Sequence, residues 1–253
     1  MAMAKAVGSV SESVSRRPSV HRTPAATAPR RGHPRGRVRR IVTVTDPGAA
    51  VLRQRCRPVG EIGAAVSRLV ADLAVTMRHA EGVGLAAPQI GVPLRVILAD
   101  TGRGLLALVN PLLRRRSGTA IAEEGCLSIP GVSAPVRRAL RVSVEGRLPT
   151  GQRVGLRAKG FIARILQHEI DHLNGVLFLD RVRAAAVRRR PLRPGERRRG
   201  VRSAAGRVGA AGRAGTRAAP SSTRRPADPW RGSTLTVVAL PERRREASRS
   251  PRA

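Results

Sequence analysis

The sequence predicts a domain that combines α-helices with short β-strands, flanked on both sides by basic segments that lack a core pattern. Apolar residues recur at helical spacing in two stretches, residues 62–77 and 162–173. Between them lie short β-rich runs, and the last two, ALRVSVEG and RVGLRA around the turn LPTGQ, form a predicted hairpin. This mixture of periodicities predicts a fold that contains both helices and a strand hairpin.

Charge separates the predicted domain from its flanks. The chain of 253 residues has a formal net charge of +33. Residues 41–182 carry 19 basic and 11 acidic side chains, so about three quarters of that charge lies outside them. Residues 1–40 and 183–253 consist mainly of Arg, Ala, Pro, Gly and Ser, with too few large apolar side chains to offset chain entropy. We therefore expect a folded domain at 41–182 between two disordered basic segments.

Composition also limits which cellular compartments the sequence favours. There is no run of eighteen apolar residues, and LTVVAL at 235–240 is too short to span a bilayer. The two cysteines, Cys56 and Cys126, do not make a disulfide framework, so we expect a cytoplasmic protein that does not enter membranes. The Arg-rich, acid-poor start also fits an organelle transit peptide, although the same bias in the C-terminal flank favours general compositional drift.

The elements follow in order along the central segment. The first helix is expected to end near Glu81–Gly82. The runs PLRVILAD and LLALVN are predicted strands, and Asn110–Pro111 is expected to end the second. From Gly160 the period becomes helical, and Asn174–Gly175 is a predicted C-terminal stop. The motif HEIDH therefore falls on a buried helix.

HEIDH carries the first functional hypothesis. Residues four apart on a helix share one face, so His168 and His172 can present their imidazoles to a single ion. A bound divalent ion lowers the pKa of water toward about 7, and Glu169, next to the first histidine, could then accept a proton from it. The pattern predicts hydrolytic chemistry; the alternative is a pair of hydrogen-bonded core histidines.

A catalytic metal site of this type needs a third protein ligand. After His172 the chain has no further histidine or cysteine, and the acid at the usual downstream distance, Glu196, lies among arginines in RPGERRRG. Upstream, Cys126 in EEGCLSIPG could complete a Cys/His/His set, unless it is simply a small buried side chain. An endopeptidase that uses Glu196 stays an alternative. We assign no role to Cys56, and we expect His79 to cap a helix end.

Three motifs together resemble the peptide deformylase family: GVGLAAPQIG at 82–91, EEGCLSIPG at 123–131 and QHEIDHLNGVLFLDR at 167–181. The resemblance covers residues 41–182. It implies an α+β fold in which antiparallel β-sheets pack around a central metal-binding helix that carries HExxH. It also implies removal of the N-formyl group from the N-terminal formyl-methionine of newly synthesised polypeptides, with release of formate.

The same resemblance implies a role for individual positions. The implied metal ligands are Cys126, His168 and His172, and the implied acid/base is Glu169. The side-chain amide of Gln89 and the backbone N–H of Leu127 would bind the formyl oxygen. We expect the methionine pocket to be lined by Val83, Phe161 and Ile165, each of which could equally be a core residue, with Gly84 beside it. Asp171, paired with Arg138, is expected to orient the metal helix.

The implied metal is Fe(II), with Zn(II), Ni(II) or Co(II) also able to occupy such a site. The substrate would enter as an extended chain that pairs with a strand. We expect a monomer whose basic flanks could make nonspecific phosphate contacts with ribosomal RNA. The alternative function is a basic ribosome- or RNA-associated protein in which the deformylase-like domain is secondary.

Overall fold

A computed structural model of the chain describes residues 35–189 and 228–242. Within these residues the strands form two antiparallel sheets, one with the order β1-β2-β3-β6-β7-β9 and one with the order β4-β5-β8. The fold is therefore a mixture of helices and antiparallel sheets, as the sequence predicts. No helix among the described residues is long and apolar enough to cross a bilayer.

The larger sheet has its longest strand, β3, near its centre. Its strands are β1 (Gly84–Ala86), β2 (Val96–Asp100), β3 (Leu105–Ser117), β6 (Arg141–Arg147), β7 (Arg153–Lys159) and β9 (Thr234–Ala239). The smaller sheet consists of β4 (Ala120–Cys126), β5 (Ile129–Arg138) and β8 (Arg188–Arg189). The predicted hairpin of ALRVSVEG and RVGLRA is the β6–β7 pair, which is confirmed.

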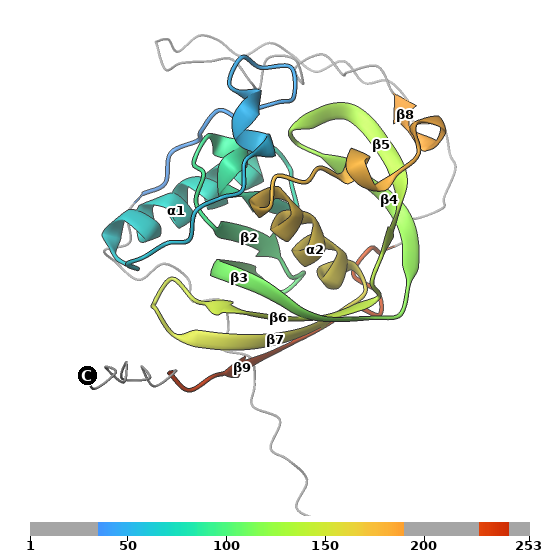
Figure 1. The fold of residues 1–253 in the computed structure, drawn as a ribbon. Helices are drawn as coiled ribbons and strands as arrows, with labels where there is room; N and C mark the ends of the chain where they lie inside the picture. The colour runs from blue at the N-terminus through green and yellow to red at the C-terminus, as the bar shows by residue number, and fades with distance from the viewer. Residues whose placement is uncertain (1–34, 190–227, 243–253) are drawn as a thin grey trace, which may run out of the picture.

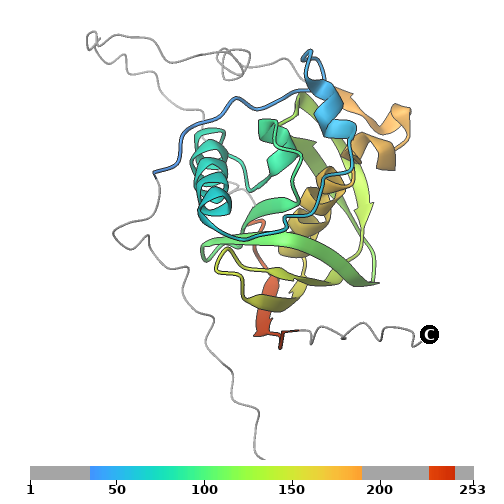
Figure 2. The same ribbon diagram turned by 60° about the vertical axis from the view of Figure 1, so that its left-hand side comes forward.

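Both predicted helices are present. They are α1 (Ala64–His79) and α2 (Phe161–Leu173), and α2 lies between the two sheets with α1 on the side away from β4 and β5 (Figures 1 and 2). Four short 3₁₀ turns occur in the part of the chain that the structure describes: η1 (Ala49–Arg53), η2 (Ala87–Ile90), η3 (Phe178–Arg181) and η4 (Ala184–Ala186). The predicted stop of the second helix is confirmed, since Asn174 follows its last residue and Gly175 adopts φ 72°.

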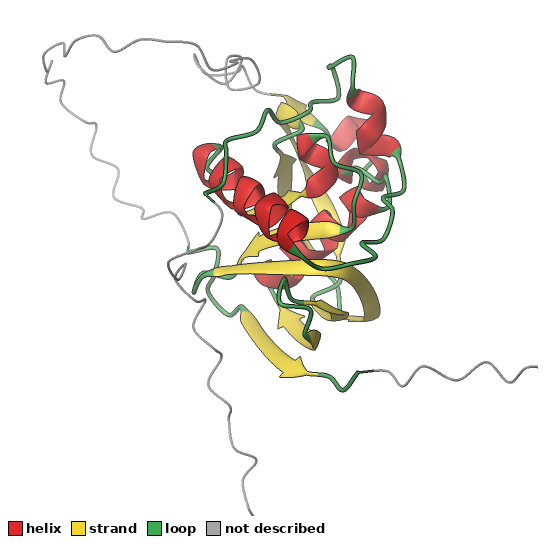
Figure 3. Cartoon of the chain, turned by 90° about the vertical axis from the view of Figure 1, so that its left-hand side faces the viewer, coloured by secondary structure: helices red, strands yellow, loops and turns green. Residues whose placement is uncertain are grey.

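The two faces of β1–β3 belong to different parts of the core. One face packs on α1, whose buried residues include Leu69, Leu73 and Met77 (Figure 3). The other packs on the apolar side of α2, including Leu166 and Leu173. Because α2 is buried between the sheets, its polar side faces β4 and β5, and HEIDH lies in the interior.

One predicted break is wrong. We expected Asn110–Pro111 to end a strand, but β3 continues through both residues with a register shift between Val109 and Leu112. The irregularity accommodates proline, which has no N–H to donate to a ladder. Asn110 takes φ 52°, and its amide exchanges two hydrogen bonds of 2.8 Å with the backbone of Val59. The side chain therefore ties the irregular part of β3 to the backbone of Val59.

The predicted flanks need correction where the structure describes them. Residues 35–40 run along α1, and the backbone N–H of Arg39 donates to Thr76 Oγ1 at 2.9 Å. In the C-terminal segment, residues 188–189 pair with β5, and Thr234–Ala239 pairs with β7. Alternating apolar residues in TLTVVA suit the open edge of β7, which the Arg-rich surroundings concealed. The other predicted disordered residues, 1–34, 190–227 and 243–253, lie outside the described residues.

Because Leu166 is fully buried between α2 and the larger sheet, its truncation should leave a cavity. We expect Leu166→Ala to lower the free energy of unfolding by about 2–5 kcal/mol in a urea titration. As a control, Ile121→Ala removes a side chain that is 59% exposed, and it should change the same quantity by less than about 0.5 kcal/mol. Equal effects of the two variants would contradict this description of the core.

Candidate active site

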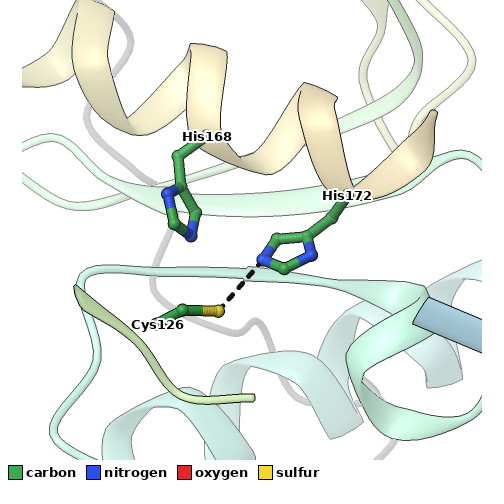
Figure 4. Close-up of side chains that lie close together, drawn as sticks. All are labelled: Cys126, His168 and His172. Carbon is green, nitrogen blue, oxygen red and sulfur yellow. Dashed lines mark hydrogen bonds between the residues drawn. The ribbon is translucent and has the colours of Figure 1, made fainter. Parts of the chain in front are cut away.

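Three potential ligand side chains converge from two elements. Cys126 ends β4, where a register shift follows Gly125, and His168 and His172 project from α2 toward it (Figure 4). Their ligand atoms all lie within 4.8 Å of one another, and Cys126 Sγ lies 3.2 Å from His172 Nε2. These residues form a possible Cys/His/His metal site. The structure thus brings together the two histidines and the upstream cysteine that the sequence singled out.

The geometry and the chemistry of this donor set fit a divalent ion. A tetrahedral ion with ordinary metal–ligand bond lengths holds its sulfur and nitrogen ligands about 3.5 Å apart. The 3.2 Å separation between Cys126 Sγ and His172 Nε2 is close to that value. Burial lowers the pKa of His172 well below its usual range, which keeps the imidazole neutral, the form that binds metals.

Glu124 controls the orientation of His168. Its Oε2 lies 3.0 Å from His168 Nδ1. Burial opposes ionisation of Glu124, but hydrogen bonds from Arg138 and His168 outweigh it and hold the pKa of Glu124 well below its usual range. An ionised carboxylate only accepts, so Nδ1 donates its hydrogen to Glu124, and Nε2 is the ring nitrogen left to face the position of a ligand.

Two buried arginines secure Glu124. Arg138 from β5 donates from Nε and Nη2 to the two carboxylate oxygens, each at 2.8 Å, and Arg164 from α2 donates to Oε1 at 2.5 Å. Arg138 also pairs with Asp171, and Arg181 donates to Asp171 at 2.5 and 2.6 Å. The predicted pairing of Asp171 with Arg138 is confirmed. The sequence reasoning missed Glu124, Arg164 and Arg181, although Glu124 lies within the EEGCLSIPG motif.

Glu169 lies beside this site and is 4% exposed. Burial raises its pKa to about 7, and its Oε2 is buried with no hydrogen-bond partner among the described residues. Gly84 makes room for the carboxylate, because a Cβ at that position would lie 2.2 Å from Glu169 Oε1. A buried carboxylate with a free oxygen and a pKa near neutrality can both accept and return a proton.

Gln89 is oriented by its own turn. In η2 its Oε1 accepts the backbone N–H of Ala86 at 2.8 Å, so the amide nitrogen points the opposite way. That nitrogen lies 3.2 Å from Ser128 Oγ and 3.6 Å from Cys126 Sγ. Gln89 is 2% exposed, and its N–H groups are therefore directed at the cysteine side of the site. Ser128 is a further neighbour that the sequence reasoning did not identify.

A cavity of about 670 Å³ opens over these groups. Its walls include Gln89, Cys126, His168 and Glu169. The residues expected to form a methionine pocket also line it, together with Gly84 and Leu127: these are Val83, Phe161 and Ile165. His172 does not line it and is only 1% exposed. Cys56 is buried away from the site and lines a separate hollow beside Arg95.

The fold and this site define a hydrolase with a HExxH helix, a buried glutamate and a possible Cys/His/His metal site. The family model described as polypeptide deformylase matches residues 38–188. The chain belongs to the polypeptide deformylase family, whose members remove the N-formyl group from nascent polypeptides. Members of this family are metal-dependent.

Individual relatives agree with this assignment. A peptide deformylase of Halothermothrix orenii is 49% identical over 144 residues, which are 56% of this chain and 94% of the relative. The crystal structure of a Thermotoga maritima peptide deformylase has 39% identity and a TM-score of 0.56, covering 58% of this chain and 99% of that one. A Synechococcus elongatus peptide deformylase in complex with actinonin has 40% identity and a TM-score of 0.54, covering 56% and 78%.

Removing the charge of Glu124 should cost stability, because Arg138 and Arg164 would keep buried charges without their main partner. We expect Glu124→Gln to lower the free energy of unfolding by about 3–5 kcal/mol in chemical denaturation. The matched control is Glu123→Gln, an exposed neighbour whose ion pair with Arg188 should contribute less than about 1 kcal/mol. A smaller loss at Glu124 than at Glu123 would contradict the role of this network.

Proposed function

We propose that the cavity binds the formylated N-terminus of a nascent polypeptide and hydrolyses its formamide, with Cys126, His168 and His172 as metal ligands. The convergence of these three side chains within 4.8 Å carries the proposal. When bound, the ion supplies Lewis acidity and lowers the pKa of water from about 16 to about 7. The proposed working ion is Fe(II), with Zn(II), Ni(II) or Co(II) able to take its place.

Glu169 is the proposed proton carrier. Its carboxylate accepts a proton as a water oxygen attacks the formyl carbon, and it delivers that proton to the nitrogen when the C–N bond breaks. The products are formate and a free α-amino group. The unpartnered Oε2 and the pKa near 7 support this role, since the group must hold a proton only for part of the cycle.

The proposed oxyanion donors are the amide of Gln89 and the backbone N–H of Leu127. Attack on a formamide places negative charge on the formyl oxygen, and fixed donors in a dry site stabilise it by about 3–4 kcal/mol each. The bond from Ala86 holds the Gln89 amide in place before the substrate arrives. The donor is therefore preorganised and needs no rearrangement as the charge develops.

The walls of the cavity suit a first residue with an apolar side chain. Val83, Phe161 and Ile165 are the proposed contacts for methionine. The backbone at Gly84 and at Gly131 of β5 borders the cavity, so an extended substrate could add its backbone to a strand there. In this arrangement the site would contact the side chain of the first substrate residue, and it would contact only the backbone of the residues that follow.

Contacts with ribosomal RNA are a further part of the proposal. Arg114, Arg115 and Arg116 are exposed on β3 and extend the basic character of the flanks onto the folded surface. Such side chains favour nonspecific contacts with phosphates. The enzyme is proposed to act in the cytoplasm as a monomer. The family match does not favour the alternative of an RNA-associated protein with a secondary deformylase domain.

Replacing the proton carrier should abolish turnover while leaving the metal ligands in place. We expect Glu169→Gln to lower kcat for formyl-Met-Ala-Ser by about 10²–10⁴-fold, measured as formate release, with unchanged metal content. Should the metal-loaded wild-type chain release no formate and yet bind RNA tightly and in a salt-dependent manner, the RNA-associated alternative would replace the proposal.

The third ligand separates this proposal from an endopeptidase. We expect Cys126→Ala, purified without oxygen, to lose its bound metal in elemental analysis, because two histidines alone hold a divalent ion weakly. Cys56→Ala is the matched control, since Cys56 is buried elsewhere, and it should keep the metal. An endopeptidase would need Glu196, which lies outside the described residues. Loss of metal on Glu196→Ala, with retention on Cys126→Ala, would favour that reading.

A further inference from the structure

A C-terminal segment returns to the domain after the family match has ended. This return segment, residues 228–242, follows the last matched residue, 188, by 40 positions. Its strand β9 pairs antiparallel with β7, from Lys159↔Thr234 to Val154↔Ala239, and extends the edge of the larger sheet (Figures 1 and 3). Leu235 and Val237 pack onto the core cluster that contains α2. The contact is therefore a regular addition to the sheet with an apolar face.

The return segment supplies the first cap of α2. The backbone N–H of Phe161 opens the helix and donates to Ser233 Oγ at 3.0 Å. The residue before it, Gly160, has no side chain that could do so, and a Cβ there would lie 2.9 Å from Ser233 Oγ. The first N–H groups of a helix have no partner within it, so an outside acceptor fixes where the helix begins.

Trp230 connects the helix start to the wall of the active cavity. Its indole meets the ring of Phe161 edge to face, with centroids 5.0 Å apart and planes at 75°. It also lies on the backbone of Gly102, where a Cβ would be 2.9 Å from Trp230 Cδ2. Phe161 lines the cavity and Trp230 does not. Trp230 thus packs behind Phe161. It fills the space into which the phenyl ring could otherwise move away from the cavity.

The turn under Trp230 is tied to a second wall residue. The backbone N–H of Asp100 donates to Val83 O at 2.8 Å, and Gly102 follows two residues later with φ 73°. Gly102 N in turn donates to Asp100 Oδ1 at 2.8 Å. The indole therefore contacts Phe161, which lines the cavity, and also the turn after β2, which is hydrogen-bonded through Asp100 to Val83, a second lining residue.

We propose that Trp230 of the return segment is a positioning residue: it holds Phe161 against the cavity and so sets how well the first side chain of the substrate binds. The proposal rests on the deformylase function proposed above. Without the indole, Phe161 can move toward Gly102, so the apolar wall of the cavity shifts outward. The unbranched side chain of the first substrate residue then loses part of its contact with that wall. Trp230 contacts Phe161 and Gly102 rather than Cys126 or Glu169, so the reacting groups should keep their geometry.

Steady-state kinetics on the metal-loaded full chain test this directly. We expect Trp230→Ala to raise KM for formyl-Met-Ala-Ser by about tenfold with kcat within about twofold, the pattern of lost binding shared by ground and transition states. The ratio of kcat/KM for formyl-Met-Ala-Ser over formyl-Phe-Ala-Ser should fall, since the wider cavity admits the larger ring. Trp230→Phe should restore most of both values because it keeps an aromatic ring behind Phe161.

Val238→Ala provides the matched control. Val238 belongs to β9 but is 54% exposed on the outer side, so its loss should change neither KM nor the substrate ratio. Unchanged KM and unchanged substrate ratio in a folded Trp230→Ala would overturn the proposal. A fall in kcat alone would overturn it as well, since that result would place Trp230 among the determinants of the chemical step.

The wild-type chain offers a second readout that does not depend on a destabilised variant. Trp230 is the sole tryptophan, so intrinsic fluorescence reports on the return segment alone. We expect titration with the product peptide Met-Ala-Ser to shift the emission, and Phe161→Leu to remove the shift. A saturating titration without any shift would overturn the proposal. Absence of formate release by the wild type would instead count against the deformylase function, whereas the fluorescence would still report occupation of the cavity.

Discussion

The structure of the site depends on one buried carboxylate, that of Glu124. It accepts from Arg138 on one side and Arg164 on the other, and it fixes the ring of His168. Arg138 belongs to β5, whereas Arg164 and His168 both belong to α2, so the carboxylate joins the β4–β5 hairpin to α2. An isolated buried charge costs several kcal/mol, and only this complete set of partners makes the arrangement tolerable.

The need to pair buried charges also explains why the polar side of α2 can face the interior. Asp171, one turn beyond Gln167, forms a second centre with Arg138 and Arg181, and Arg138 belongs to both centres. Gln167 accepts the backbone N–H of Ala139 at 3.1 Å and donates to its carbonyl at 2.9 Å. The helix is therefore held against β5 by polar bonds and against the larger sheet by apolar packing. These contacts on both sides fix the rotation of α2 about its own axis. That rotation directs His168 and His172 toward Cys126.

The sequence predicted the structure correctly where a local pattern of residues determines it. It failed where contacts between residues far apart in the chain determine it. Periodicity predicted α1 and α2, and the missing third ligand pointed to Cys126 because few other donors existed. The continuation of β3 through Pro111 was not predictable, since it depends on Asn110 bonding to Val59, 51 residues away. Glu124 was missed for a similar reason: an acidic pair before Cys126 reads as solvated until both arginines are placed.

The return segment shows how composition can hide structure. Net charge and the scarcity of aromatic residues made residues 183–253 read as one basic tail, yet a six-residue alternation was enough to occupy the open edge of β7. Ser233 fixes the first turn of α2, while the partners of Glu124 and Asp171 hold the turns that follow. The helix that presents HEIDH is thus restrained from its first N–H onward. Part of this restraint comes from residues that lie beyond the family match.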